Sequence, residues 1–329
     1  MTEKRAFVTG ATGFLGLNLV EQLTGAGWQV RALHRPTSDL TFLCRFPVEV
    51  VEGDLLEPES LVRALPERVD AVFHVAADTS VWARSAARQT RINVEGTANL
   101  LQAALETGAR RFVHTSTWNT FGLQQGEITE DLPQLGGRSR VNYDRSKFLA
   151  EEEVRSAVGR GLDAVILNPS HIMGRYDRQS WARLIISLHK QWIPLAPPGA
   201  GCFCHGEAVA KAHIAAAERG RTGQNYLLGG DFASLLEVFT IIGEVAGCKA
   251  PKAVLPAAGF RIAGRINVIL AALLGYEPDL TPDGAAIASA RARVVSDRAE
   301  RELDYRAVPV RQLVEESYGW LKAQGLLDR

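Results

Sequence analysis

The residues of this chain best suited to proton transfer are a tyrosine and a lysine four positions apart. Tyr143 and Lys147 lie in a stretch, Tyr143–Gly159, whose pattern predicts a helix, so their side chains share one face. A free phenol has a pKa of about 10, and a nearby ammonium favours its phenolate form. The pair therefore indicates acid–base chemistry on one ligand, with the tyrosine carrying the proton.

A glycine-rich turn near the start of the chain is the second chemical signal. Gly10, Gly13 and Gly16 directly follow the apolar run Arg5–Thr9 and open an apolar stretch, Phe14–Gly25. Glycine lets the backbone turn sharply and approach a pyrophosphate, whose charge then lies at a helix N-terminus. This strand–turn–helix context predicts a dinucleotide site.

The glycine-rich turn and the tyrosine–lysine pair both lie within an alternation of short strand patterns and longer helical patterns. The predicted strands are Arg5–Thr9, Gln29–His34, Val48–Glu52, Ala71–Val75, Arg111–Thr115 and Ala164–Leu167. The predicted helices between them are Phe14–Gly25, Pro58–Leu65, Thr90–Thr107 and Tyr143–Gly159. This βαβ rhythm predicts an α/β fold with a Rossmann-type doubly wound parallel sheet.

The second half of the chain loses this rhythm. We expect a dinucleotide-binding domain over residues 1–168 and a smaller, mostly helical substrate-binding region over residues 169–329, with residues 223–230 returning to the main sheet. Its predicted helices are Glu207–Arg219, Leu235–Ala246, Ala257–Leu274 and Val310–Gln324. Because Arg261 and Arg265 interrupt the apolar stretch Ala257–Leu274, we expect a buried or pocket-lining helix there, with a surface-lying amphipathic helix as the alternative.

The composition restricts which classes of partner the protein can bind and which cellular compartment it occupies. The 37 basic and 37 acidic residues balance, so no global field attracts nucleic acid or a membrane, and we expect a small-molecule ligand. The four cysteines contain no Cys-x-x-Cys pair, and the few residues before the first strand leave no room for a leader, which favours a cytoplasmic protein. The segment Cys202–His205 lacks a fourth zinc ligand, so we expect a strand edge there and no metal site.

Two motifs resemble the fingerprint of a known family. TGATGFLG, residues 9–16, and the Tyr143-x-x-x-Lys147 spacing are similar to those of the extended short-chain dehydrogenases/reductases, the NAD-dependent epimerase/dehydratase superfamily. VEGDLLEPESL, VFHVAA, RINVEGT, GQNYLLGG and VVSDRAERELDYR most resemble its dihydroflavonol 4-reductase-like branch. The resemblance implies redox chemistry at a carbonyl or alcohol, with Lys147 also binding the nicotinamide ribose.

The resemblance also implies a hydroxyl after the fifth strand that polarises the substrate carbonyl. Counting five residues back from Gly122 gives Thr117, and Ser116 is the close alternative. Relatives that dehydrate nucleotide sugars carry an Asp-Glu pair just after this hydroxyl. Trp118 and Asn119 stand there in this chain, which disfavours dehydration.

The end of the second strand bears on the choice of cofactor. A Rossmann site for NAD usually has an acidic residue there, whereas this chain has His34 followed by Arg35. A guanidinium matches the geometry of a phosphate, so NADP(H) is favoured and NAD(H) is the less favoured alternative.

Other cofactor contacts follow from the resemblance, and each also has a local explanation. Asp54 could be a turn residue, Asn93 could bond a helix backbone, and His171 could line a pocket. The expected contacts beyond the glycines, Tyr143 and Lys147 are Thr12, Phe14, Leu15, His34, Arg35, Asp54, Leu55, Ala76, Ala77, Asn93, Thr115, Asn168, Pro169, Ser170 and His171.

Several large side chains fall in segments expected near the nicotinamide. They would indicate an apolar or aromatic substrate if they face the cavity, and nothing if they face the core. These substrate-pocket candidates are Trp82, Trp118, Asn119, Phe121, Met173 and Trp181.

The leading hypothesis is an NADPH-dependent carbonyl reductase or alcohol dehydrogenase with Tyr143 as proton donor or acceptor. The enzyme alternative is a nucleotide-sugar epimerase with tightly bound NAD(P), for which Arg175, Arg178 and Arg183 could bind a diphosphate. The non-enzyme alternative is an NADP-binding redox sensor, which would not need both Tyr143 and its lysine. The resemblance further suggests a homodimer formed by the helices predicted at residues 90–107 and 143–159.

Overall fold

The computed structural model describes residues 3–80, 82–124, 126–190, 193–274, 278 and 280–327. Its largest sheet contains β1 (Arg5–Thr9), β2 (Gln29–His34), β3 (Val48–Glu52), β4 (Ala71–His74), β5 (Phe112–Thr115), β7 (Ala164–Pro169) and β10 (Asn225–Leu228). All strands are parallel, in the order β10-β7-β5-β4-β1-β2-β3. This confirms the predicted doubly wound sheet. The order reverses between β1 and β4, whose carboxyl ends are where such folds bind ligands.

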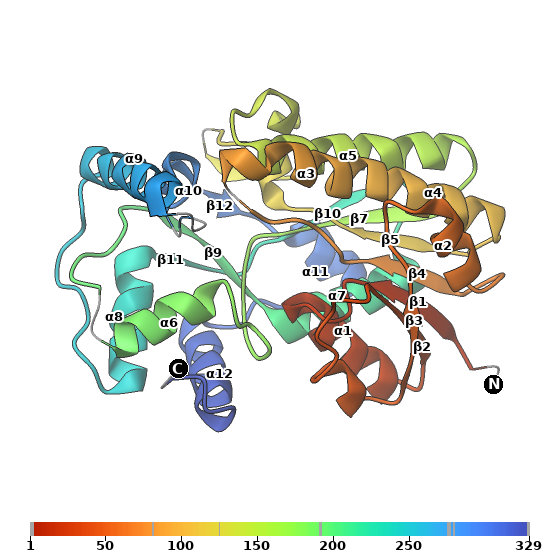
Figure 1. Cartoon of the computed structure of the whole chain (residues 1–329), viewed down its shortest axis with the longest axis horizontal. Coiled ribbons are helices and arrows are strands. Elements are labelled where there is room, and N and C mark those ends of the chain that lie inside the picture. The colour runs from red at the N-terminus through yellow and green to blue at the C-terminus, as the bar shows by residue number, and fades with distance from the viewer. Residues whose placement is uncertain are drawn as a thin grey trace.

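Helices cover both faces of this sheet, because its central strands are apolar on both sides (Figure 1). One layer contains α1 (Phe14–Gly25), α7 (Gly206–Arg219) and α11 (Asp297–Leu303). The other contains α2 (Pro58–Ala64), α3 (Ala86–Thr90), α4 (Gly96–Glu106) and α5 (Asn142–Gly159). Two apolar clusters, one under each layer, form the core that fixes the strand ends.

The helix predicted over residues 90–107 differs from the structure at its start. Helical backbone begins at Ala86, and a π-helical segment, Arg91–Glu95, separates α3 from α4. Such a segment admits an i→i+5 hydrogen-bond pattern that apolar spacing does not reveal. It places Asn93 in the buried interior.

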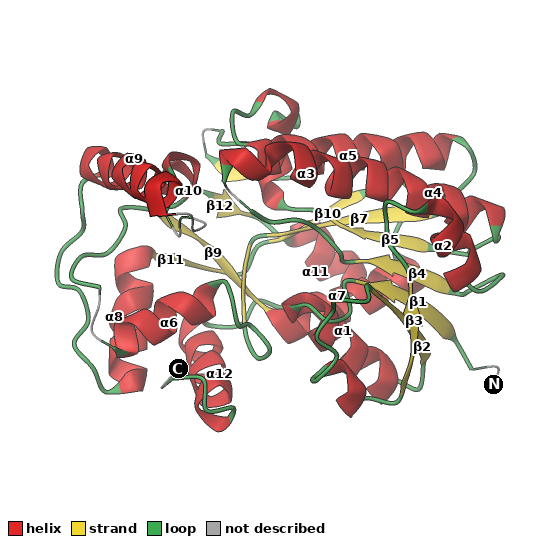
Figure 2. Ribbon diagram, in the orientation of Figure 1, coloured by secondary structure: helices red, strands yellow, loops and turns green. Residues whose placement is uncertain are grey.

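The second region has its own small sheet and helices, shown separately from the main sheet in Figure 2. The order is β11 (Asp231–Ser234), β9 (Ala200–His205), β8 (His171–Met173), packed with α6 (Trp181–His189), α8 (Leu235–Ala246) and α12 (Val310–Ala323). The short strands β6 (Glu127–Ile128) and β12 (Arg293–Val294) pair beside it. The expected strand edge at Cys202–His205 is wrong: β9 is the central, fully buried strand, because two short neighbours with weak sequence patterns flank it.

The helix α9 (Ala257–Leu274) also differs from expectation. It packs against the short helix α10 (Pro282–Ile287), and its buried residues are Gly264 and Ala271. The expectation of a buried helix was wrong, since one six-residue helix covers only one face of an eighteen-residue one. Among the described residues, α9 is also the one helix whose length and composition would suffice to cross a membrane.

Candidate active site

The glycine turn has the shape that a dinucleotide pyrophosphate requires. Gly10 has φ of +71°, and a Cβ there would lie 2.6 Å from the backbone nitrogen of Ala76. A Cβ on Gly16 would lie 2.0 Å from the carbonyl oxygen of Gly10. Exposed Gly13 is the N-cap of α1, which has neither a side-chain cap nor an acidic residue in its first turn. The N–H groups at this helix end can therefore take an anion.

The residues expected at the adenosine end lie at the ends of β2 and β3. His34 is half-buried, with Nδ1 3.0 Å from the carbonyl oxygen of Arg35. The Arg35 side chain is exposed and makes no hydrogen bond or ion pair with another residue that the structure describes. Asp54 accepts a hydrogen bond from the backbone of Leu56 at 2.9 Å, so one carboxylate oxygen shapes its own turn.

Thr117 and Tyr143 meet at the carboxyl end of β5. The Thr117 side chain acts on that of Tyr143 and lowers its pKa, and Thr117 is 7% exposed. Ser116, the alternative hydroxyl, instead donates to the buried carboxylate of Glu151. Since the strand alternates sides, only one of these consecutive hydroxyls can face the tyrosine. The structure thus brings together Thr117 and Tyr143.

The environment of the pair favours a protonated phenol. Burial, and then the charge of Asp144, raises the pKa of Tyr143 to about 12, although the Thr117 side chain opposes the shift. Burial lowers the pKa of Lys147 to about 8, opposed by the carboxylate of Glu151. At pH 7 the site therefore holds a phenol and, for the most part, an ammonium.

The position of Lys147 explains why the expected phenolate is not favoured here. Lys147 is 2% exposed, and its amine donates to the backbone carbonyl of Thr115 at 2.7 Å. Desolvation therefore dominates the pKa of Tyr143, in contrast to the expectation that the ammonium would lower it. The Thr115 hydroxyl bonds Nε2 of His213 at 2.8 Å, whose Nδ1 lies 2.8 Å from the carbonyl oxygen of Val209.

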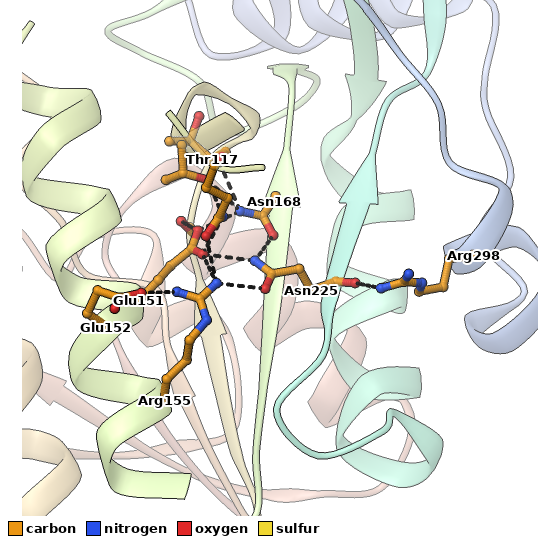
Figure 3. A network of polar contacts seen from close by, with 10 residues as sticks. Thr117, Glu151, Glu152, Arg155, Asn168, Asn225 and Arg298 are labelled. Atoms are coloured by element: carbon orange, nitrogen blue, oxygen red, sulfur yellow. Dashed lines mark hydrogen bonds and ion pairs between the residues drawn. The ribbon is translucent and has the colours of Figure 1, made fainter. Parts of the chain in front are cut away.

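A buried carboxylate, which the sequence analysis missed, ties the catalytic elements together (Figure 3). Glu151 is fully buried and accepts hydrogen bonds from five side chains: Ser116, Gln134, Arg155, Asn168 and Asn225. Asn168 also donates to the carbonyl oxygen of Thr117 at 3.0 Å. The i, i+4, i+8 series of Lys147, Glu151 and Arg155 along α5 was the available sequence signal.

Asn93 joins the loop after β4 to α5. Its amide oxygen accepts from the backbone of Asp78 at 2.8 Å, and its amide nitrogen donates to the Ser146 hydroxyl at 3.0 Å. Ser146 in turn donates to the carbonyl oxygen of Tyr143 at 2.9 Å. Asn93 is therefore placed to hold the first turn of α5, with no contact to Lys147 required.

The residues after β7 divide between structure and pocket. The Ser170 hydroxyl lies 2.6 Å from the carbonyl oxygen of Gly229 and so ties β7 to the end of β10. The His171 ring packs on Trp181 and Phe203, and burial lowers its pKa to about 4. A neutral imidazole at pH 7 fits the pocket-lining alternative better than an acid.

Only part of the expected substrate pocket faces the tyrosine. Trp82 lines a small recess beside Tyr143, with Asp283 of α10 on another side. Trp118 and Phe121, which lie in the 3-10 turn after Thr117, instead pack in a buried apolar cluster with Leu227. The remaining candidates also lie elsewhere. Met173 is fully buried in the apolar cluster of the second region, Trp181 packs against that second cluster, and Asn119 donates to Asp144 at 2.8 Å.

The arginines considered for a sugar diphosphate have protein partners. Arg175 lies within 3.0 Å of carboxylate oxygens of both Glu21 and Glu207, and Arg178 lies 3.0 Å from Asp39. Arg183 also has a partner within the chain. Their positive charge is thus largely balanced by the protein itself.

Three relatives are similar over most of the chain. The "Putative dihydroflavonol 4-reductase" of Synechocystis is 30% identical, with 97% of this chain and 95% of the relative covered. The sterol demethylase protein B of Methylococcus capsulatus is 31% identical over 97% of this chain and 99% of the relative. A 4-hydroxy-2-methyl-3-oxo-4-farnesyl-3,4-dihydroquinoline-1-oxide ketoreductase of Stigmatella aurantiaca is 32% identical, covering 80% and 79%.

Solved structures agree in fold. The crystal structure of gox2253 has a TM-score of 0.85 at 32% identity, covering 98% of this chain and 99% of the other. The dTDP-glucose 4,6-dehydratase DesIV of Streptomyces venezuelae, solved with NAD and TYD bound, has a TM-score of 0.78 at 25% identity, covering 97% of each chain. The profile of the NAD dependent epimerase/dehydratase family matches residues 6–229. With its glycine turn and its tyrosine–lysine helix in place, this chain belongs to that family of nicotinamide-dinucleotide enzymes within the extended short-chain dehydrogenases/reductases.

Proposed function

We propose that the protein is an NADPH-dependent carbonyl reductase. The observation that carries this proposal is the interaction of the Thr117 side chain with Tyr143, whose pKa is raised to about 12, at the strand end beside the glycine turn. The dinucleotide supplies hydride to the carbonyl carbon when bound. Tyr143 donates its proton to the carbonyl oxygen, Thr117 holds that oxygen, and Lys147 would bind the nicotinamide ribose. In the reverse direction Tyr143 accepts the proton of an alcohol.

The raised pKa of Tyr143 favours reduction over oxidation at neutral pH. A pKa of about 12 keeps the phenol protonated and ready to donate. The oxidative direction needs the phenolate, which becomes more abundant as the pH rises. We therefore expect the ratio of oxidation to reduction rates to increase with pH.

The choice of NADP(H) rests on Arg35. Its exposed guanidinium has no partner among the described residues and lies one residue beyond β2, where a 2′-phosphate would bind. Replacing it in Arg35→Gln should raise the KM for NADPH by about 10- to 100-fold and leave that for NADH within about twofold. Arg63→Gln, on the surface of α2, is the matched control. Equal KM changes for both cofactors would contradict the assignment.

The epimerase alternative has less support. Arg175 and Arg178 are paired with acidic residues, which weakens the case for a sugar-diphosphate site. Trp82 at the recess favours a substrate with an apolar portion, and one relative is named a ketoreductase. A redox sensor would not require the Thr117–Tyr143 contact. The homodimer through the helices of residues 90–107 and 143–159, which contain α4 and α5, is retained as a proposal.

Rates of NADPH and NADH oxidation against a panel of ketones, aldehydes and nucleotide sugars test the function directly. We expect NADPH-dependent turnover of an apolar ketone or aldehyde and none of nucleotide sugars. Tyr143→Phe should lower kcat by about 100- to 10,000-fold at unchanged NADPH affinity. Tyr318→Phe, on α12, should be neutral. Unchanged turnover in Tyr143→Phe would overturn the mechanism.

A further inference from the structure

The outer face of α9 is apolar and uncovered. Ile262, Ile266, Ile269 and Leu273 are spaced by four, three and four residues, so they form one stripe along the helix. Their exposed fractions are 56%, 53%, 59% and 76%. The stripe points away from the packed side at Gly264, where a Cβ would lie 2.9 Å from the backbone of the loop before α10. This face therefore has no partner among the described residues.

Positive charge borders this apolar stripe. Arg261 and Arg265 lie along one side of it, and neither forms a hydrogen bond or ion pair with a residue that the structure describes. Residues 249–274 contain these two arginines, Lys249 and Lys252, and no acidic residue. A local charge of four thus exists in a chain whose formal net charge is zero. Because the net charge of the whole chain is zero, the overall composition does not reveal this positively charged segment.

The helix also lies next to the candidate active site. It packs on α10, and Asp283 of α10 lines the recess that contains Tyr143 and Trp82. Figure 1 shows α9 and α10 together at one side of the molecule, near the end of α3. The side of α9 that packs on α10 thus lies one helix away from the recess at Tyr143, and the apolar stripe lies on the opposite side of α9.

We propose that α9 binds the surface of an anionic lipid bilayer, with its apolar stripe below the headgroups and its two arginines among them. An amphipathic helix with a cationic border has the properties of such an interfacial helix. Resting on the proposed function, we further infer that the enzyme takes an apolar ketone or aldehyde from that bilayer. This departs from the sequence expectation of no membrane partner, which considered net charge alone.

Two other occupants fit the charges less well. A second copy on this face would bring two segments of four positive charges together, with no acidic residue in either segment to pair with them. A bilayer-spanning arrangement would bury Arg261 and Arg265 in hydrocarbon and separate α9 from α10. Anionic headgroups instead complement the arginines while the packed side stays on the protein.

Vesicle co-flotation of the full chain with NADPH tests the proposal. The probes are vesicles of phosphatidylcholine alone and vesicles containing phosphatidylglycerol. We expect binding to the anionic vesicles that weakens as salt is raised, because ions screen exposed charges. Added vesicles should also protect the amides of residues 257–274 from hydrogen exchange.

Two variants separate the contributions of charge and apolar surface. Arg261→Gln/Arg265→Gln should weaken binding to the anionic vesicles by about fivefold per charge. Ile266→Gln/Ile269→Gln/Leu273→Gln should weaken it by at least about 100-fold. Arg63→Gln and Val62→Gln, exposed on α2, are the matched controls and should bind as the unmodified chain does.

The possible results of these experiments distinguish between a bilayer and a second copy as the partner of α9. Equal vesicle binding by the chain and its α9 variants, or no binding at all, would overturn the proposal. Self-association that depends on α9 without vesicle binding would identify a second copy as the occupant instead. Thermal unfolding and turnover of a water-soluble carbonyl report whether a variant is folded. Vesicle binding without carbonyl turnover by the unmodified chain would leave the membrane proposal standing and refute only the proposed reductase activity.

Discussion

The helices α5 and α9 have the same length, eighteen residues, and opposite relations to their surroundings. Helix α5 buries a lysine and a glutamate, Lys147 and Glu151, whereas α9 exposes most of its isoleucines and leucines. Charges in the interior need partners, and α5 finds them in four neighbouring segments. Apolar side chains in water need cover, and the outer face of α9 has none among the described residues. Helix α5 is thus held in place by the partners of its buried charges, whereas α9 is packed on one side only, against α10.

The largest expected effect on stability comes from removing the buried carboxylate of α5. Glu151→Leu removes the buried acceptor shared by Arg155, Asn168 and Asn225, so each of these donors loses a hydrogen bond to a carboxylate. We expect a loss of about 3 to 5 kcal/mol in the free energy of unfolding. Urea denaturation measures it, with Glu152→Gln, the exposed neighbour that also pairs with Arg155, as control. A loss no larger than that of the control would mean that the network is not stabilising.

The second prediction separates stability from activity on α5. Lys147→Met removes a buried ammonium, so we expect the chain to gain about 1 to 3 kcal/mol of stability at pH 7 while reductase turnover falls at least 100-fold. Thermal unfolding and initial rates measure the two effects. Arg145→Met, on a half-buried position of the same helix, is the control for charge removal. A less stable Lys147→Met would show that the bond to Thr115 outweighs desolvation.

The same lysine predicts how stability depends on pH. Its pKa is lowered from 10.5 to about 8 in the folded chain, so below pH 8 both states hold the proton and the fold carries the full desolvation penalty. Between pH 8 and 10.5 the unfolded chain holds more protons than the folded one, so this group makes stability rise with pH. The difference in unfolding free energy between Lys147→Met and the unmodified chain should therefore shrink across that window. A constant difference would contradict the assigned pKa.

The smallest expected effect on stability comes from a substitution on the exposed face of α9. Leu273→Gln on α9 should change the free energy of unfolding by less than about 0.5 kcal/mol, because the side chain is already 76% exposed. Leu101→Gln, fully buried on α4, provides the contrast and should be strongly destabilising. A large loss in Leu273→Gln would mean that α9 is covered within the protein itself.

The sequence predicts strongly periodic elements well and weak ones poorly. The bounds of β1, α1 and α8 coincide with those predicted, since long apolar patterns and clear turn residues define them. The short strands β8 and β11 were not predicted, because three or four residues carry no periodicity. The exposure of α9 was missed for another reason: apolar spacing defines a helix and leaves open whether anything covers it.

The candidate site shows the same division. Thr117, Tyr143 and Lys147 follow from motifs whose members lie on one strand end and one helix. Glu151 does not, because four of its five donors come from segments that only the tertiary fold brings together. Trp118 likewise packs in a buried apolar cluster, and no spacing distinguishes a core aromatic from a cavity one.

The π-helical segment Arg91–Glu95 makes the chain sensitive to the deletion of a single residue at this point. Its wider turn accommodates one residue more than a regular α-helix, and Asn93 lies within it. Deleting a single residue there would allow one continuous helix from α3 to α4, with a better backbone ladder. Everything before the deletion would then rotate by about 100°, and the link from Asp78 to Ser146 would be lost. The π-helical segment thus contains one residue more than a regular α-helix would, and this extra residue lets Asn93 reach both Asp78 and Ser146. The first turn of α5 therefore depends on an irregularity in a neighbouring helix.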